Sequence, residues 1–180
     1  MIRLFVGLAL PEANCLRLAS LGGGVPGARW IAPENMHVTL KFLGDVENGA
    51  AEDIDSALAT VACHPVQLRL KGVGFFGQPR NARILWAGVE ESETLIRLYA
   101  KIEAALEAIG IARETRNFAP HVTLARLKKS PAGRLESFVA EHGLFSDGPV
   151  EISSFALFSS YLASSGAIYT PEAIYPLEHT

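Results

Sequence analysis

His37-Val38-Thr39-Leu40 recurs as His121-Val122-Thr123-Leu124, 84 positions further along a chain of 180 residues. An Ala-Pro pair precedes each copy, a few residues upstream at Ala32-Pro33 in the first case and directly upstream at Ala119-Pro120 in the second. A repeat that contains a histidine and spans nearly half a chain indicates a duplicated strand unit rather than a chance match. The first expectation for the fold is therefore two related halves, each with one motif strand.

Both stretches have the alternation of a half-buried β-strand. Residues i and i+2 of a strand share a face, so His37 and Thr39 point one way while Val38 and Leu40 point into a core. The second copy has the same pattern. If the two halves pack about a pseudo-twofold axis, two His/Thr pairs face each other across a groove.

The paired motifs bring together side chains that suit proton transfer. An imidazole titrates near neutral pH, so one histidine can act as a neutral base while the other acts as a charged acid. Two threonine hydroxyls can donate hydrogen bonds to the oxygens of a phosphate. A single His-x-Thr is more typical of a half-buried polar face, but two copies favour a site that cleaves a phosphodiester without a metal ion.

The rest of the sequence predicts an α+β fold. Its elements are expected in the order β-α-β-α-β-β-α-β-α-β-β, which includes hairpins and argues against a doubly wound parallel sheet. Leu16, Leu18 and Leu21 are expected on the buried face of the first helix, and Gly44-Asp45 is expected to turn the chain. The expected strands are 3–8, 36–43, 66–73, 82–89, 121–127, 150–158 and 167–175. One helix is expected to begin at Pro11, and three more are expected at 50–62, 92–109 and 131–142. Ser92 is expected to cap the helix 92–109 and Gly110 to end it.

The composition excludes several classes of protein. Apolar residues make up 49% and charged residues 19% of the chain, which is incompatible with a disordered segment. The net charge of −3 argues against a protein that coats long nucleic acids, so any contact with RNA should be short and local. Cys15 and Cys63 form no zinc-binding pattern and favour a reducing, cytoplasmic location. The apolar stretches 4–10 and 152–170 are expected to be strands, not membrane spans.

The sequences around the two motifs resemble a known superfamily. The supporting stretches are Arg3-Leu4-Phe5-Val6, Arg29-Trp30-Ile31, Pro33 to Gly44, Phe118 to Arg126 and the strand from Phe155 to Ser160. Together they resemble the two-histidine phosphoesterases, and within these the bacterial and archaeal RNA 2′,3′-cyclic phosphodiesterases, first called 2′-5′ RNA ligases. The resemblance extends from residue 1 to about residue 177.

The resemblance implies a fold and an activity. The fold is a single domain over 1–180 with two lobes, in which two antiparallel sheets with outer helices surround a central groove. The activity opens a 2′,3′-cyclic phosphate at an RNA 3′ end and leaves a 2′-phosphate. It implies His37 as proton donor, His121 as proton acceptor, and catalytic roles for Thr39 and Thr123. No cofactor, metal ion, membrane or obligate protein partner is implied; the expected partners are RNA 3′ ends or small cyclic-phosphate nucleotides.

Two cations are further candidates for binding the phosphate. The resemblance implies Arg126, but ideal alternation puts it on the face opposite His121, so it reaches the groove only if the strand bulges or ends there. Lys41 lies four places after His37 and should share its face, although relatives often carry arginine at this position. Lys128-Lys129, with Arg113 and Arg116, form a basic group that is either a solvated face or a guide for an RNA end.

Other questions stay open at the level of the sequence. Phe5, Phe42, Phe118 and Trp30 are candidates to stack a terminal base, although most aromatic residues belong to the core. The same site could also act as a ligase, joining a 2′,3′-cyclic phosphate end to a 5′-hydroxyl as a 2′-5′ bond. A non-catalytic binder of cyclic-phosphate ends is a third possibility, which the intact histidines and threonines argue against.

Overall fold

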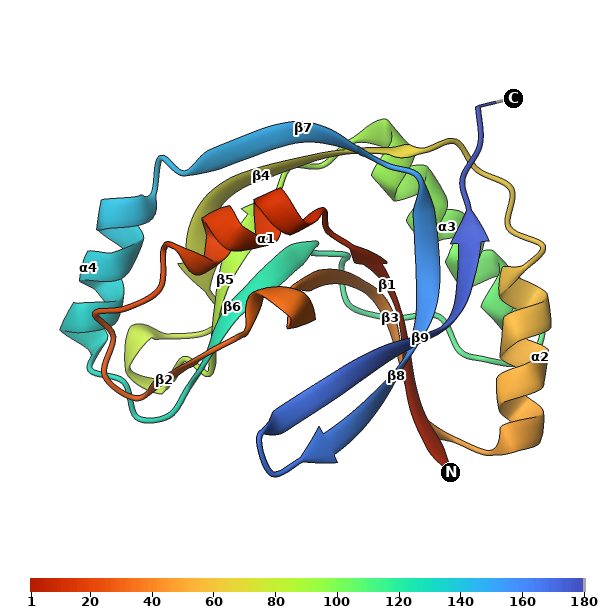
Figure 1. The fold of residues 1–180 in the computed structure, drawn as a ribbon, viewed down its shortest axis with the longest axis horizontal. Coiled ribbons are helices and arrows are strands. Elements are labelled where there is room, and N and C mark those ends of the chain that lie inside the picture. The colour runs from red at the N-terminus through yellow and green to blue at the C-terminus, as the bar shows by residue number, and fades with distance from the viewer. Residues whose placement is uncertain (180) are drawn as a thin grey trace.

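The computed structural model describes residues 1–179 of the chain. Within this range, four helices are interspersed among nine strands, the last three of which are consecutive, and all strand pairs are antiparallel, as in an α+β fold (Figure 1). The strands are β1 (Ile2–Ala9), β2 (Ala28–Trp30), β3 (His37–Val46), β4 (Val66–Phe75), β5 (Ile84–Val89), β6 (His121–Leu127), β7 (Ser146–Ile152), β8 (Ser154–Ala163) and β9 (Gly166–Pro176). The helices are α1 (Glu12–Ala19), α2 (Asn48–Leu58), α3 (Glu93–Glu107) and α4 (Ala132–His142), with short 3₁₀ turns at Pro33–Asn35 and Pro79–Asn81.

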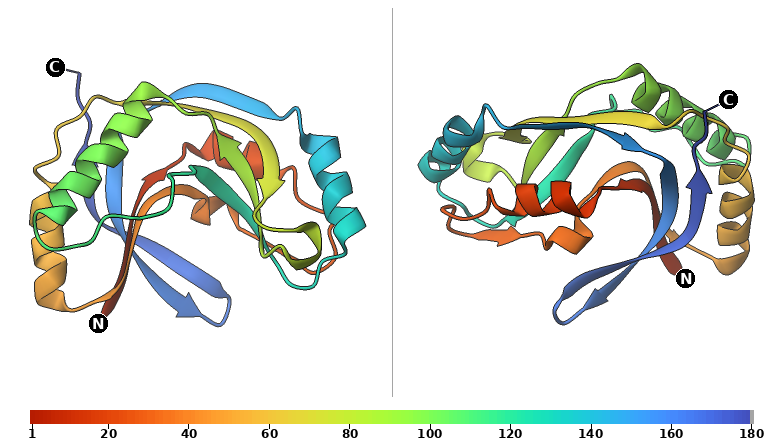
Figure 2. Two further views of the ribbon diagram at one scale, coloured as in Figure 1. Left: turned by 180° about the vertical axis from the view of Figure 1, so that it is seen from behind. Right: turned by 45° about the horizontal axis from the view of Figure 1, so that its top comes forward.

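The strands join into one arched antiparallel sheet (Figures 1 and 2). The order is β7-β4-β5-β6-β3-β1-β8-β9, and β2 pairs with β6 beside this path. Helices α2 and α3 lie together at one end of the arch and α4 lies at the other (Figure 2). The expectation of two sheets therefore needs a correction, because β3 and β6 connect the two halves through the pair Val38–Val122.

Helix α3 forms where the sequence predicts it. Leu95, Leu98, Ile102 and Leu106 are fully buried along one face, as their spacing of three and four requires. The Ser92 hydroxyl accepts a hydrogen bond from the Leu95 backbone N–H, which caps the first turn. Gly110, at a φ of +94°, adopts the left-handed conformation that ends the helix.

Several local expectations are wrong. Leu16 is 54% exposed, whereas Leu18 is buried as expected and Cys15 is buried in addition. The chain does not turn at Gly44-Asp45; β3 continues to Val46, because Gly44 at a φ of +75° takes up an irregularity in the pairing with β1. The expected strand 150–158 is divided into β7 and β8 at Ser153, where the chain passes from one half of the sheet to the other. The sequence analysis also missed β2, which has only three residues.

Within residues 1–179, no helix combines the length and apolar character needed to cross a membrane.

Candidate active site

The two motifs meet where β3 and β6 pair. Val38 and Val122 lie opposite each other, and both are fully buried on the side of the sheet that faces the core. His37, Thr39, His121 and Thr123 are half-buried on the other side, which we call the histidine face. An antiparallel register with Val38 opposite Val122 sets His37 on the side of Thr123 and Thr39 on the side of His121. The tertiary structure thus brings together the four residues that the repeat singled out.

Both imidazoles are oriented in the same way by the backbone. His37 Nδ1 lies 2.8 Å from the carbonyl oxygen of Asn35, and His121 Nδ1 lies 2.7 Å from that of Ala119. A carbonyl oxygen can only accept a hydrogen bond, so Nδ1 carries the proton in each ring. In the neutral form of either histidine, Nε2 is therefore the nitrogen with the free lone pair. This arrangement directs proton transfer to the Nε2 atoms.

The environment of His37 differs from that of His121. His37 Nε2 lies 2.9 Å from Thr39 Oγ1, which donates its hydroxyl proton when the ring is neutral. Burial lowers the pKa of His37 below its usual value, the hydrogen bond to Asn35 opposes this, and the positive charges of His121 and Arg126 lower the pKa further. In the unliganded protein, His37 is consequently more strongly biased toward the neutral form than a free histidine.

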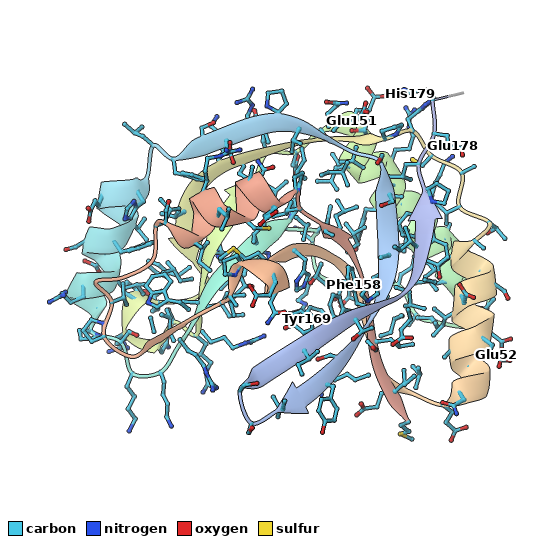
Figure 3. All side chains as sticks on the ribbon, in the orientation of Figure 1. Glu52, Glu151, Phe158, Tyr169, Glu178 and His179 are labelled. Atoms are coloured by element: carbon cyan, nitrogen blue, oxygen red, sulfur yellow. The ribbon has the colours of Figure 1, made fainter. Side chains whose placement is uncertain are left out.

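Aromatic rings flank each histidine. The His37 ring centroid lies 4.8 Å from that of Phe5 and 5.2 Å from that of Tyr169, and Phe158 stacks on Phe5 at 5.1 Å. Phe158 and Tyr169 come from the two strands of the β8–β9 hairpin, near the middle of the molecule (Figure 3). Gly7 lies beneath these rings and lets β1 approach β3 closely, because a Cβ there would lie 2.8 Å from the Val38 carbonyl oxygen.

The second histidine has its own aromatic neighbours. The His121 ring contacts Phe76 edge-to-face at 5.0 Å between centroids, and Trp86 lies at 6.4 Å. The Trp86 ring occupies space that a side chain at residue 74 would fill, since a Cβ on Gly74 would come within 2.5 Å of it. Sequence reasoning missed Phe76, Trp86, Phe158 and Tyr169 as neighbours of the site. No signal near the motifs points to them, because they lie on other strands or beyond strand ends.

A β-bulge in each motif strand decides which later residues share the histidine face. In β3, consecutive residues Val6 and Gly7 of β1 pair with Lys41 and Thr39, so Leu40 is the extra residue. In β6, Leu85 and Trp86 of β5 pair with Ala125 and Thr123, so Leu124 is the extra residue. Both bulges fall three places after the histidine. An extra residue reverses the alternation beyond it.

The bulge in β6 places Arg126 on the histidine face. Leu124 and Ala125 are both buried, and Arg126 is exposed, as expected when the alternation reverses. Its positive charge lies close enough to His37 to lower the pKa of that residue. The condition that the sequence set for Arg126, a bulge in its strand, is met. The corresponding position of the first motif, five places after its histidine, is Phe42, which is 73% exposed.

The expected position of Lys41 on the histidine face is wrong. The bulge in β3 turns Lys41 toward the core, where its side chain is 7% exposed and its Nζ lies 2.9 Å from Oε1 of the 3% exposed Glu103. Lys41 also donates a hydrogen bond to the Ala112 carbonyl oxygen at 2.8 Å, and Glu103 Oε2 accepts one from the Glu114 backbone N–H at 2.9 Å. Lys41 therefore joins β3, α3 and the segment that leads to the second motif, and it does not line the site.

The aromatic residues proposed to stack a base divide into two groups. Phe5 is buried beside His37. Phe42 is exposed, and its ring centroid lies 6.3 Å from that of Phe5. Phe118 instead stacks on Tyr99 of α3, with ring centroids 4.0 Å apart and planes at 7°. Trp30 packs against Phe138 of α4. Phe118 and Trp30 therefore serve the packing of helices rather than the histidine face.

A cavity of about 450 Å³ lies away from the motif histidines and threonines. It is enclosed by α2, the second half of β3 and the segment after α3, and its lining includes Ile54, Ile111 and Thr115. Because it holds neither imidazole, we place the chemistry on the histidine face. Among the described residues, no three His, Cys, Asp or Glu side chains are grouped in a way that could hold a metal ion.

Known sequences that are similar to this chain are those of phosphoesterases. The model of the family described as LigT like phosphoesterase matches residues 8–86 and 88–169. An RNA 2′,3′-cyclic phosphodiesterase of Aquifex aeolicus is 34% identical over 146 residues, which cover 79% of this chain and 78% of that protein. One of Aeropyrum pernix is 37% identical over 150 residues, which cover 81% of this chain and 84% of that protein.

Solved structures resemble the whole chain. A protein of Thermus thermophilus matches with a TM-score of 0.77 and 28% identity, and the match covers 98% of both chains. The structure of E. coli LigT complexed with 3′-AMP matches with a TM-score of 0.76 and 23% identity, covering 99% of both chains. At 23% identity, the match with E. coli LigT shows a likeness of the fold alone.

Proposed function

This chain belongs to the family of LigT-like phosphoesterases, and we propose that it hydrolyses 2′,3′-cyclic phosphates at RNA 3′ ends to 2′-phosphomonoesters. The observation that carries the proposal is the pair of imidazoles on one face, each with Nδ1 bound to a backbone carbonyl oxygen, so that proton transfer falls to the Nε2 atoms. The names of the two similar enzymes supply the class of substrate. The proposed mechanism needs no metal ion.

The reaction begins with a water molecule beside His121. Nε2 of His121 removes a proton from this water, and the resulting hydroxide attacks phosphorus in line with the 3′ oxygen. The bond between phosphorus and the 3′ oxygen breaks, and the 3′ oxygen takes a proton from Nε2 of His37. The product carries a 3′-hydroxyl and a 2′-phosphate. His121 then holds the proton that His37 has lost, and exchange with solvent restores both histidines.

The threonines and Arg126 stabilise charge on the phosphate in this scheme. Thr39 and Thr123 donate their hydroxyls to the non-bridging oxygens, where negative charge develops in the transition state. For Thr39 this replaces the hydrogen bond that its hydroxyl makes with His37 in the unliganded protein. Arg126 supplies a positive charge on the same face.

The lowered pKa of His37 bears on its role as the proton donor. A donor must carry a proton, whereas burial favours the neutral ring. The bound phosphodiester is an anion, and a negative charge next to the imidazole raises its pKa and offsets the effect of burial. In this scheme His37 becomes charged together with substrate binding, while His121 stays neutral as the base.

The test uses an RNA oligonucleotide that ends in a 2′,3′-cyclic phosphate, incubated with the protein in EDTA. We expect a 2′-phosphate product at a rate that chelation does not change. Loss of turnover in EDTA with recovery on adding a divalent ion would contradict the metal-free mechanism. A 2′-5′ joined product when a strand with a 5′-hydroxyl is in excess would identify a ligase, and binding without turnover would identify a binding protein.

Substitution of the histidines tests their roles. His37→Ala and His121→Ala should each lower the rate by about 10²- to 10⁴-fold, the usual contribution of a general acid or base. A substrate with a better leaving group at the 3′ position needs less protonation, so it should partly restore His37→Ala and not His121→Ala. If this substrate restores the activity of His121→Ala instead, His121 is the proton donor and His37 is the proton acceptor. Losses below about tenfold in both variants would contradict acid–base catalysis by this pair.

A further inference from the structure

The half-buried residue Asn35 contacts two parts of the molecule that lie far apart in the sequence. Its side-chain Nδ2 donates a hydrogen bond to the carbonyl oxygen of Ala167 in β9, at 3.0 Å and 132 positions further along the chain. Its own carbonyl oxygen accepts the hydrogen bond from His37 Nδ1, at 2.8 Å. We propose that Asn35 is a positioning residue that holds the His37 ring and the β8–β9 hairpin in one arrangement. The kinetic consequence of this coupling rests on the function proposed above, whereas the coupling itself does not.

The two motifs hold their carbonyl acceptors by different means. The residue that accepts the hydrogen bond from His121 is Ala119, which Pro120 follows. A proline restricts the residue before it to extended conformations and fixes its own φ, so the chain orients this carbonyl locally. The first motif has Met36 in place of the proline, and Asn35 instead ends a 3₁₀ turn. The first histidine therefore depends on a tertiary contact, the amide of Asn35, for a restraint that the second obtains from a proline.

The end of the β8–β9 hairpin projects from the arch (Figures 1 and 2). The pairing of β8 with β1 extends as far as Ser159, and beyond it the large apolar side chains of Tyr161, Leu162 and Ile168 are exposed. Within residues 1–179, the hydrogen bond that joins the hairpin end (161–168) to another element comes from Asn35. Segments with few buried contacts open easily, so loss of this bond should loosen the hairpin end.

Strand β9 reaches His37 a second time through Tyr169, two residues after Ala167. The Tyr169 ring meets the His37 ring edge-to-face, with 5.2 Å between the ring centroids (Figure 3). Asn35 thus fixes both the carbonyl that sets which ring nitrogen is protonated and the strand whose tyrosine packs on the same ring. Without its amide both restraints are weakened, and the neutral ring of His37 distributes its proton between Nδ1 and Nε2.

Spectra of the histidine rings test the positioning directly. Two-bond nitrogen–proton correlations, recorded at about pH 8.5 and so well above the usual histidine pKa of about 6.5, show which ring nitrogen is protonated. We expect the Nδ1-protonated form at both His37 and His121 in the wild type. Asn35→Ala should convert His37 to a mixture of the two neutral forms and leave His121, the internal control, unchanged. A single Nδ1-protonated form at His37 in this variant would overturn the proposal.

Two further variants provide a second perturbation and a matched control. Asn35→Ser keeps a polar side chain that is too short to span the distance to Ala167, so it should affect the His37 ring as Asn35→Ala does. Gln67→Ala removes an amide that joins β4 to β7 through a bond of 3.3 Å to Glu151, which lies at the upper edge of the molecule, away from Tyr169 (Figure 3). This control should leave both histidine rings unchanged.

Hydrogen exchange separates positioning from a general role in stability. In Asn35→Ala and Asn35→Ser, the backbone amides of 161–168 should exchange faster, while those of β3 and β6 keep the protection that they have in the wild type. Faster exchange throughout the sheet in both variants would show that Asn35 stabilises the whole fold, and it would overturn the positioning role.

The kinetic test uses the RNA that ends in a 2′,3′-cyclic phosphate. The threonines and Arg126, which bind the phosphate in the proposed mechanism, are intact in Asn35→Ala, so KM should stay within about twofold of the wild type. The value of kcat should fall about tenfold, because a small displacement of a catalytic group can cost up to about 10²-fold in rate. A substrate with a better leaving group at the 3′ position should reduce this loss, since it needs less protonation by His37. An equal loss for both substrates, or the same loss in Gln67→Ala, would contradict the positioning of a proton donor.

The spectra and the kinetics together keep the two proposals apart. If the wild-type protein hydrolyses no cyclic phosphate while the His37 ring still responds to Asn35→Ala, the proposed function fails and the positioning role stands. If the wild-type protein is active and Asn35→Ala changes neither the protonated nitrogen of His37 nor kcat, the positioning role fails and the proposed function stands.

Discussion

The strands β3 and β6 carry the same four residues and the same bulge, yet they use the positions after the bulge differently. Four places after the histidine, Lys41 forms a buried ion pair whereas Ala125 fills a small buried space. Five places after it, Phe42 exposes an aromatic ring whereas Arg126 presents a cation to the histidine face. The two strands thus provide equivalent backbone frames, and the residues that differ within them give a buried ion pair in one half and an exposed cation in the other.

The surroundings of the two histidine rings also differ between the halves. His37 is packed between Phe5 and Tyr169 and hydrogen-bonded to Thr39, while His121 contacts Phe76. Burial lowers the pKa of His37, so the proposed role of His37 as proton donor depends on the negative charge of the bound phosphodiester. The two histidines therefore share a motif and a backbone hydrogen bond at Nδ1, and they differ in their ring neighbours.

The largest effect is expected on stability, from Lys41. Lys41→Ala leaves the Glu103 carboxylate buried without its cation, and breaking a buried pair costs about 3–5 kcal/mol in the free energy of unfolding. Urea unfolding measures this. The double variant Lys41→Met/Glu103→Leu should recover most of the loss, because it removes both charges.

Phosphate binding by Lys41 would give a different result. Lys41→Met/Glu103→Leu would then lower kcat/KM strongly in a protein of near wild-type stability. That outcome would return Lys41 to the site and remove the contrast with Arg126.

The next effect concerns the two threonines. Thr39→Val and Thr123→Val keep the β-branched shape and delete the hydroxyl, so the fold should be retained. Loss of one hydrogen-bond donor to a developing charge costs about 10²- to 10³-fold in rate, and steady-state kinetics on the cyclic RNA end measure it. Near wild-type rates in both variants would show that the hydroxyls do not contact the phosphate.

A smaller effect is expected from Arg126. A hydrogen bond to a charged group contributes about 1.5–3 kcal/mol, so Arg126→Gln should lower kcat/KM by about one to two orders of magnitude. Arg134→Gln, a cation of α4 that bonds to the Gly24 carbonyl oxygen, serves as the control. Because the bulges make positions 42 and 126 equivalent, Phe42→Arg in the Arg126→Gln background should recover part of the activity. No recovery would show that the two halves address the substrate unequally.

The smallest effect is the pH dependence of stability due to His37. Its pKa is lower in the folded than in the unfolded state, so below about pH 6.5 the unfolded chain binds a proton that the folded protein does not. The stability contributed by neutral His37 is present above this pH and is lost as the pH falls, by at most about 1.4 kcal/mol per pH unit. Urea unfolding between pH 7.5 and 5 should show a steeper loss for the wild type than for His37→Gln. Identical slopes would contradict the lowered pKa.

Local patterns in the sequence predicted a large part of this structure. The helix α3, its cap at Ser92, the strand β6 and the shared face of His37 and Thr39 follow from periodicity and turn chemistry within a few residues. The short strand β2 and the division of β7 from β8 could not be predicted in this way. Both depend on which neighbours are available for pairing, and pairing is not encoded in adjacent residues.

The repeat of His-Val-Thr-Leu by itself determined which four side chains form the candidate site, because alternation along a strand places His and Thr together wherever that strand lies. Only the tertiary structure decided where the side chains beyond each repeat point. The extra residues Leu40 and Leu124 arise from pairing with β1 and β5, and each reverses the alternation beyond it. For this reason Lys41 is buried against α3 and Arg126 lies on the histidine face, the opposite of what an ideal strand predicts.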